Sequence, residues 1–125
     1  MKDAVIVSTA RTPIAKAMRG AFNDLKTPSM TAIAIRTAVE RAGIEPAQIE
    51  DLVLGTAMQS GTAAINPARL SALASGLPMS VSGKTIDREC ASGLMAIAIT
   101  KVVLHTLGRF LPVAKDCNRP ILLKK

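Results

Sequence analysis

A long apolar run with few charges, residues 91–107, limits the folds open to this chain. It follows a short β-leaning segment, Thr85-Ile86, and the charged triplet Asp87-Arg88-Glu89. Polar residues interrupt the run from Thr100 onward, and it is shorter than the ~20 apolar residues that a membrane-spanning helix needs. The pattern therefore predicts a buried helix of a globular protein and no association with a membrane.

Cys90 is predicted to lie at the first turn of this helix and is a candidate catalytic nucleophile. The backbone N–H groups and the positive dipole at a helix start stabilise an anion, so they favour a thiolate. The same N–H groups would hold the oxyanion that forms when the sulfur adds to a carbonyl. Small residues at 91–93 leave room for an acyl group. The alternative role for Cys90 is packing, because a lone cysteine in an apolar segment is usually buried.

Strand-like and helix-like segments alternate along the first 100 residues. Short apolar runs predict buried strands at residues 4–7 and 51–55, and Thr85-Ile86 leans toward a strand. Thr27-Pro28 predicts a helix start, with the Thr27 hydroxyl as its cap, and Gly43 predicts the end of that helix. This alternation predicts an α/β fold.

A second helix is predicted to begin at Asn66-Pro67, where the asparagine caps the helix and the proline occupies its first turn. Gly76 and Pro78 predict its end. The residues expected to form its apolar stripe are Leu70, Leu73, Ala74 and Leu77.

The net charge of +7 is concentrated at the C-terminal end. Residues 1–100 carry 10 basic and 8 acidic side chains, whereas residues 101–125 carry 6 basic and 1 acidic. Phe22 and Phe110 are the only aromatic residues, and no nucleic-acid-binding motif accompanies the basic end. We therefore expect a solvated basic tail and no nucleic-acid partner.

The cysteine content predicts a reducing compartment. Cys90 and Cys117 provide neither a disulfide framework nor the ligand spacing of a metal site. No charged-then-apolar leader precedes the first expected strand. Together these features predict a cytoplasmic protein without a bound metal.

Three segments resemble the thiolase family, particularly its acetyl-CoA acetyltransferase branch. They are Arg11-Thr12-Pro13, the stretch N-P-A-R-L-S-A-L-A-S-G-L-P from Asn66, and D-R-E-C-A-S-G-L-M-A-I-A around Cys90. The third resembles the family pattern Asn-Arg-x-Cys-x-Ser-Gly-x-x-Ala, with Asp87 where asparagine is usual. The segments occur in the family's order, and the resemblance runs from about residue 4 to residue 100.

The resemblance implies a partial thiolase-like N-terminal domain, which is an incomplete αβα layered sheet. It implies strands over residues 4–9, 51–56 and 81–86. It implies that Cys90 accepts an acyl group from an acyl-CoA substrate, with coenzyme A bound as part of the substrate and no separate cofactor. The reaction would be the Claisen condensation of two acetyl-CoA molecules to acetoacetyl-CoA, or thiolysis in reverse. The family also implies a homodimer or homotetramer.

The resemblance ends near Thr100, which divides the chain into a partial thiolase domain, residues 1–100, and a helix end with a divergent basic tail, residues 101–125. Pro112 and Pro120 disfavour a central strand in that tail. One hypothesis is a truncated thiolase whose tail arises from a frameshift near Lys101. Such a chain would leave a sheet edge unpaired and one face of the Cys90 helix uncovered.

The other two side chains that a thiolase needs are not evident. His105 is the only histidine, and 15 residues of helix would place it about 22 Å from Cys90. Cys117 lacks the glycine-rich surroundings of the family's second cysteine. A catalytically silent chain that associates with full-length thiolase subunits through residues 80–90 therefore stays open as an alternative, and a ketoacyl synthase is a weaker one.

Overall fold

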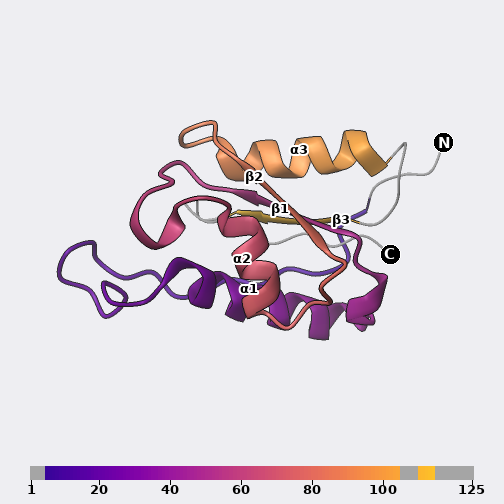
Figure 1. Ribbon diagram of the computed structural model, residues 1–125, viewed down its shortest axis with the longest axis horizontal. Helices are drawn as coiled ribbons and strands as arrows, with labels where there is room; N and C mark the ends of the chain where they lie inside the picture. The colour runs from indigo at the N-terminus through magenta and orange to yellow at the C-terminus, as the bar shows by residue number, and fades with distance from the viewer. Residues whose placement is uncertain (1–4, 105–109, 115–125) are drawn as a thin grey trace.

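A parallel sheet lies between helices on both of its faces in the computed structural model, which describes residues 5–104 and 110–114 (Figure 1). The strand order is β2-β1-β3, and β1 pairs in parallel with both neighbours. Helices α1 and α2 cover one face, and α3 lies on the other (Figure 1). The bounds are α1 Thr27–Ala42, η1 Pro46–Gln48, β1 Asp51–Gly55, η2 Gly61–Ala63, α2 Pro67–Ala74, β2 Ser82–Ile86, α3 Ser92–Leu104 and β3 Phe110–Ala114. The expected partial, layered α/β fold is confirmed.

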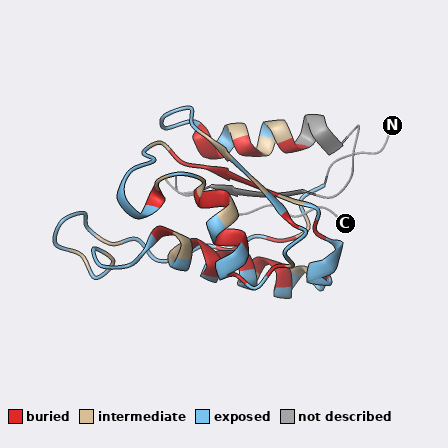
Figure 2. Cartoon of the chain, in the orientation of Figure 1, coloured by how far each residue is buried: buried red, intermediate tan, exposed pale blue. Residues whose placement is uncertain are grey.

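The central strand β1 is buried on both sides, as its continuous apolar sequence predicts. Leu52 and Leu54 join the hydrophobic core beneath α1 and α2. The largest fully buried side chains from the helices and strands of this region are Ile35, Leu52, Leu54, Val53 and Val81. Figure 2 shows the buried residues along β1 and on the inward sides of α1 and α2.

Helix α1 begins and ends close to the predicted residues, but its start is held differently. Thr27 is the first helical residue, and the N-cap position belongs to Lys26, whose side chain makes no capping bond. The Thr27 hydroxyl lies 3.2 Å from Thr62 Oγ1, which also accepts from the Thr27 amide at 3.1 Å. Gly43 ends the helix in a left-handed conformation, φ 60°, as predicted.

Helix α2 confirms the predicted cap, because the Asn66 side chain accepts a hydrogen bond from the Arg69 amide. Of the predicted apolar stripe, Leu77 is buried in the core, but the rest is wrong: Leu70 is 42 % exposed, and Leu73 and Ala74 are also exposed. The buried face consists of Pro67, Ala68, Ser71 and Ala72. Small residues are needed there because the helix backbone closely approaches β2: a Cβ at Gly83 would lie 2.7 Å from the Arg69 Cα.

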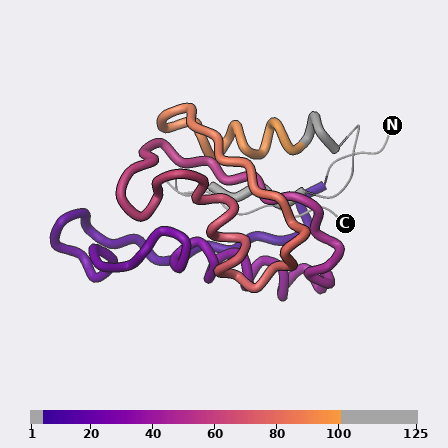
Figure 3. Tube along the Cα trace, viewed as in Figure 1, coloured from indigo at the N-terminus to yellow at the C-terminus, as the bar shows by residue number. Residues whose placement is uncertain are grey.

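The strand predicted over residues 4–9 is wrong for its described part. Residues 5–10 form no strand, and Ile6 is 64 % exposed. An apolar run forms a strand only where it pairs with a neighbour, and residues 5–10 pair with none of the described strands, whose order is β2-β1-β3. In Figure 3 the indigo trace of the N-terminal residues leads instead to a loop that projects beyond the layers.

The sequence did not predict β3, which lies within the supposed tail. Its register pairs Val53 with Pro112 and Gly55 with Ala114. Proline lacks an N–H and is tolerated where one side of a strand needs no partner, as in an edge strand. In the sheet of the described residues, β3 is such an edge.

Helix α3 is buried along one stripe and not all round as its composition suggested. Ser92, Gly93, Ala96 and Thr100 face inward, whereas Leu94 is 59 % exposed. This outcome agrees with the predicted uncovered face. None of the described helices combines the length and apolarity that spanning a bilayer requires.

Gly55 allows the start of α3 to dock against the end of β1. A Cβ at position 55 would lie 2.6 Å from the Gly93 nitrogen and even closer to the Ser92 carbonyl, so one of the two backbones would have to move. We predict that Gly55→Ala lowers the free energy of unfolding by about 2 kcal/mol or more, measured by urea denaturation.

The matched control is Gly43→Ala. Gly43 has a positive φ but open space around its Cβ position, so its substitution adds backbone strain alone, about 1 kcal/mol. Equal losses in the two variants would contradict the proposed close packing.

Candidate functional site

Cys90 lies in the turn that links β2 to α3, at the carboxyl ends of the parallel strands β1 and β2. In parallel α/β sheets this edge is where ligands bind. The Cys90 side chain is exposed, which excludes the alternative of a buried packing cysteine in this conformation. The residue lies two positions before Ser92, the first helical residue, and not within the first turn as predicted.

Two amides of the turn are already used by the backbone. The Ala91 amide donates to the Arg88 carbonyl at 2.9 Å, and the Ser92 amide donates to the Glu89 carbonyl at 3.0 Å. In this conformation these two N–H groups are therefore occupied and do not provide the anion-binding groups that the sequence suggested. The turn is ordered by its own hydrogen bonds.

Asp87, the departure from the family pattern, has a structural role in the turn. Its Oδ1 accepts a hydrogen bond from the Glu89 amide at 2.9 Å. An asparagine has the same side-chain oxygen, so either residue can make this bond. The aspartate additionally places a negative charge three residues before Cys90. The difference between the two residues is thus one of charge and not of shape.

Arg88 extends along α3. Its Nη1 lies 3.9 Å from the sulfur of Met95, three residues after the first residue of the helix, and the contact is exposed. Because the guanidinium is solvated, its effect on a thiolate at position 90 is expected to weaken with salt. The expectation that Arg88 favours the thiolate stays a prediction.

The sequence identified Ser92 as a small residue and as a match to the family pattern, but assigned it no role. Its side chain is buried and makes two hydrogen bonds back into the turn. It accepts from the Arg88 amide at 2.8 Å and donates to the Glu89 carbonyl at 2.6 Å. The sequence signal that could have indicated this role is the spacing: Ser92 lies two residues after Cys90 and four after Arg88.

The Asn66 segment fixes β2, the strand that leads to Cys90. Asn66 Nδ2 donates to the Gly83 carbonyl at 3.0 Å, and its Oδ1 accepts from the Thr85 hydroxyl at 2.8 Å. The Thr85 hydroxyl also accepts from the Ala68 amide at 3.2 Å. Asn66 therefore caps α2 and joins it to β2 at once, of which the sequence predicted only the cap.

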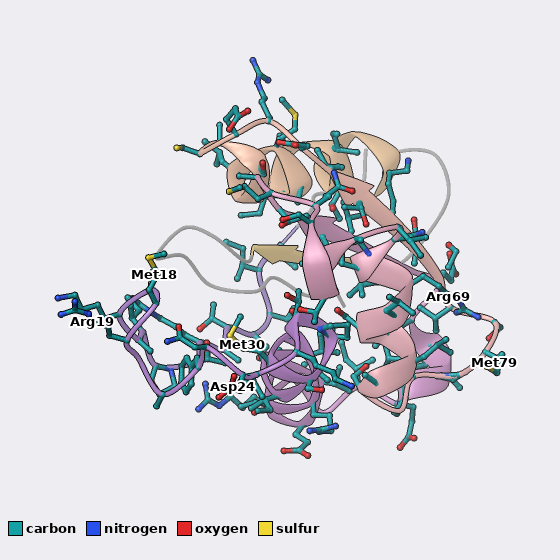
Figure 4. The ribbon with its side chains drawn as sticks, turned by 60° about the vertical axis from the view of Figure 1, so that its left-hand side comes forward. Met18, Arg19, Asp24, Met30, Arg69 and Met79 are labelled. Atoms are coloured by element: carbon teal, nitrogen blue, oxygen red, sulfur yellow. The ribbon has the colours of Figure 1, made fainter. Side chains whose placement is uncertain are left out.

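Arg69 holds the connection between α2 and β2. It donates to the Met79 carbonyl at 2.9 Å and to the Val81 carbonyl. Figure 4 shows Arg69 beside the segment that carries Met79, whereas Met18 and Arg19 lie on the projecting N-terminal loop. The segment that begins at Asn66 thus holds β2, the strand before Cys90, and the hydrogen bonds described for Asn66 and Arg69 are structural.

A surface hollow lies between α1, η1 and the segment after α2, on the face of the sheet opposite α3 (Figure 1). Its lining residues are Ile35, Arg36, Val39, Glu40, Pro46, Ser75, Gly76 and Leu77. It is therefore remote from Cys90.

The other chemical groups considered from the sequence are not brought to Cys90 by any observation. His105 and Cys117 lie outside the described residues. Among residues 5–104 and 110–114, no three His, Cys, Asp or Glu side chains are grouped closely enough to hold a metal ion.

The charge at position 87 leads to a testable prediction. Asp87→Asn keeps the bond to the Glu89 amide and removes a negative charge near the sulfur, so it should speed the alkylation of Cys90 by iodoacetamide about twofold at low salt. The rate is measured by mass spectrometry of the Cys90 peptide. The gain should shrink at 0.5 M salt, because salt at that concentration screens charges that are more than about 5 Å apart.

Asp24→Asn is the control, because it removes the same charge from the exposed N-terminal loop (Figure 4). An equal gain in both variants would show an effect of net charge alone.

Comparison with known proteins gives one consistent result. The family described as "Thiolase, N-terminal domain" matches residues 4–105. An acetyl-CoA acetyltransferase of Cupriavidus necator is 39 % identical over 99 residues, which are 79 % of this chain and 25 % of that protein. The peroxisomal 3-ketoacyl-CoA thiolase 2 of Arabidopsis thaliana is 35 % identical over 96 residues, which are 77 % of this chain and 21 % of that protein.

A solved structure shares the fold. The Acat5 thiolase from Ascaris suum, crystallised in complex with coenzyme A, superposes with a TM-score of 0.84 at 27 % identity, covering 90 % of this chain and 30 % of that one. The chain thus spans between about a fifth and a third of the length of the proteins to which it is similar.

Proposed function

The chain belongs to the thiolase family through its N-terminal domain, and from that premise we propose that Cys90 accepts an acyl group from a coenzyme A thioester. The carrying observation is the exposed thiol in an ordered turn at the carboxyl ends of β1 and β2. This position lets a large thioester reach the sulfur from solvent, while the turn keeps the sulfur attached to the sheet.

The proposed step is an acyl transfer between two sulfur atoms. The Cys90 thiolate adds to the thioester carbonyl carbon, and a C–S bond forms as the carbonyl electrons move to oxygen. When the carbonyl re-forms, the bond to the coenzyme A sulfur breaks, and coenzyme A leaves as a thiolate that takes up a proton. The acyl group stays on Cys90 as a new thioester.

For the complete reaction we propose condensation of two acetyl-CoA molecules to acetoacetyl-CoA, or thiolysis in the reverse direction. That reaction also needs a base to accept the thiol proton and a group to deprotonate the second acetyl-CoA. The 125 residues contain one histidine, His105, and one further cysteine, Cys117. Because the sequence aligns neither with those roles, we propose that this chain alone is impaired beyond the first step.

We further propose that the protein acts as a homodimer or homotetramer in the cytoplasm. Support for an oligomer comes from β2, an edge strand of the described sheet with exposed side chains at Ser82 and Lys84. The cytoplasmic location rests on the cysteine usage, and the Arabidopsis relative named above is peroxisomal. Imaging of a tagged chain in its own cells decides between the two compartments.

The alternative function is a silent chain that associates with thiolase subunits. The observation that favours it is the outer edge of β2, which no strand within residues 5–104 and 110–114 pairs with, together with the exposed Leu94 on α3, since such surfaces invite association. Co-elution with the purified Cupriavidus necator acetyltransferase in size-exclusion chromatography, without acylation of Cys90, would favour this alternative.

The acyl transfer is tested directly. We predict that the purified chain, incubated with acetyl-CoA, gains one acetyl group on the Cys90 peptide and releases an equal amount of coenzyme A thiol. Peptide mass spectrometry locates the group, and hydroxylamine should remove it, because thioesters are cleaved by that reagent.

Cys90→Ala should show no hydroxylamine-sensitive acetyl group on that peptide. The proposal fails if the parent chain melts cooperatively and its Cys90 reacts with iodoacetamide, yet no acetyl group appears on Cys90.

A further inference from the structure

The conformation of Glu89 sets the direction in which the chain leaves β2 and reaches Cys90. Its φ is 45°, in the left-handed region that residues with a Cβ rarely adopt. Such a conformation persists only where surrounding bonds determine it, and it clusters at functional sites. The bonds that determine it here can be identified.

Hydrogen bonds hold Glu89 from both sides. Its amide donates to Asp87 Oδ1 at 2.9 Å. Its carbonyl accepts twice from Ser92, from the hydroxyl at 2.6 Å and from the amide at 3.0 Å. The Ser92 hydroxyl also accepts from the Arg88 amide at 2.8 Å, so one side chain joins the two residues before Cys90.

These bonds differ from those of an ordinary helix cap. A capping serine accepts from an amide two or three residues later in the helix. The Ser92 hydroxyl accepts from an amide four residues earlier, outside the helix, and donates to a carbonyl three residues earlier. Its side chain therefore shapes the turn and not the helix end.

Ser92 is itself fixed by the sheet. It is 1 % exposed, and its carbonyl lies against Gly55, where a Cβ could not be accommodated. The backbone of β1 thus fixes Ser92, and Ser92 fixes the two residues that precede Cys90. The Ser92 hydroxyl is thus one of the bonds that connect the turn of the exposed thiol to the buried centre of the fold.

We infer that Ser92 is a positioning residue for Cys90: its hydroxyl holds Glu89 in the left-handed conformation that presents the thiol to an acyl-CoA. The inference rests on the proposed acyl transfer for its purpose, but the state of the turn is measurable without it. Loss of the hydroxyl removes the part-buried bonds to the Arg88 amide and the Glu89 carbonyl, which keeps only the bond from the Ser92 amide, and Glu89 can then relax toward negative φ.

Ser92→Ala tests the inference, with Thr100→Val as the matched control. Thr100 is on the same helix, is 4 % exposed, and its hydroxyl donates to the Ala96 carbonyl at 2.6 Å, so the control also removes one buried hydroxyl from α3. The readout is the rate of iodoacetamide alkylation of Cys90 from pH 6 to 10, measured on the Cys90 peptide of the full chain.

We expect Ser92→Ala to slow Cys90 alkylation at neutral pH about fivefold and to change the shape of its pH profile, and we expect Thr100→Val to alter neither. Where acetyl transfer is observed in the parent chain, it should fall about tenfold or more, because acyl transfer also requires orientation. Identical alkylation profiles for the parent and Ser92→Ala would overturn the inference. Absence of acetyl transfer in the parent, with the expected alkylation change, would overturn the proposed function and leave the positioning role supported.

A second set of variants keeps the inference testable if the Ser92→Ala chain does not fold. Glycine adopts φ 45° without steric cost, so Glu89→Gly removes the need for Ser92 to hold that conformation. In the Glu89→Gly background, Ser92→Ala should change the alkylation rate less than about twofold. In a Glu89→Ala background, which removes the same charge but keeps a Cβ, the full effect should persist, and equal effects in the two backgrounds would overturn the inference.

Discussion

The close contact between the end of β1 and the start of α3 determines how this chain presents its cysteine. Gly55 touches the backbone of Ser92 and Gly93 at a distance that leaves no room for a side chain. Because β1 is buried on both sides and paired on both edges, its position is fixed by the whole sheet. The contact therefore fixes the start of α3, and Ser92 in turn fixes the turn that carries Cys90.

The same packing principle operates on the opposite face. Gly83 of β2 lies against the backbone at Arg69, and the inward side of α2 consists of small residues. A chain with two aromatic residues cannot fill wide gaps between its layers, so its helices approach the strands closely. Glycines on the strands and small residues on the helices permit that approach, and the elements that flank Cys90 are both held by it.

The turn also changes where reactivity at Cys90 is expected to originate. The amides of Ala91 and Ser92 are bonded to carbonyls within the turn, so an anion at the sulfur does not have them as partners in this conformation. Exposure, orientation and the nearby charges of Asp87 and Arg88 are then the factors that the described residues contribute. Thiolate chemistry at such a site is governed by its electrostatic surroundings.

The sequence alone determined the α/β pattern, the strand β1, the three helices and the Asn66 cap, because each depends on neighbouring residues in the chain. The family resemblance supplied the bounds of β2 and favoured Cys90, whose role stays a prediction. The tertiary structure decided the rest. Residues 5–9 pair with none of the described strands, and which face of α2 is buried depends on how closely Gly83 lets the helix approach β2. The role of Ser92 likewise appears only when β1 and α3 are brought together, since burial and partner edges belong to contacts between distant segments and not to local sequence.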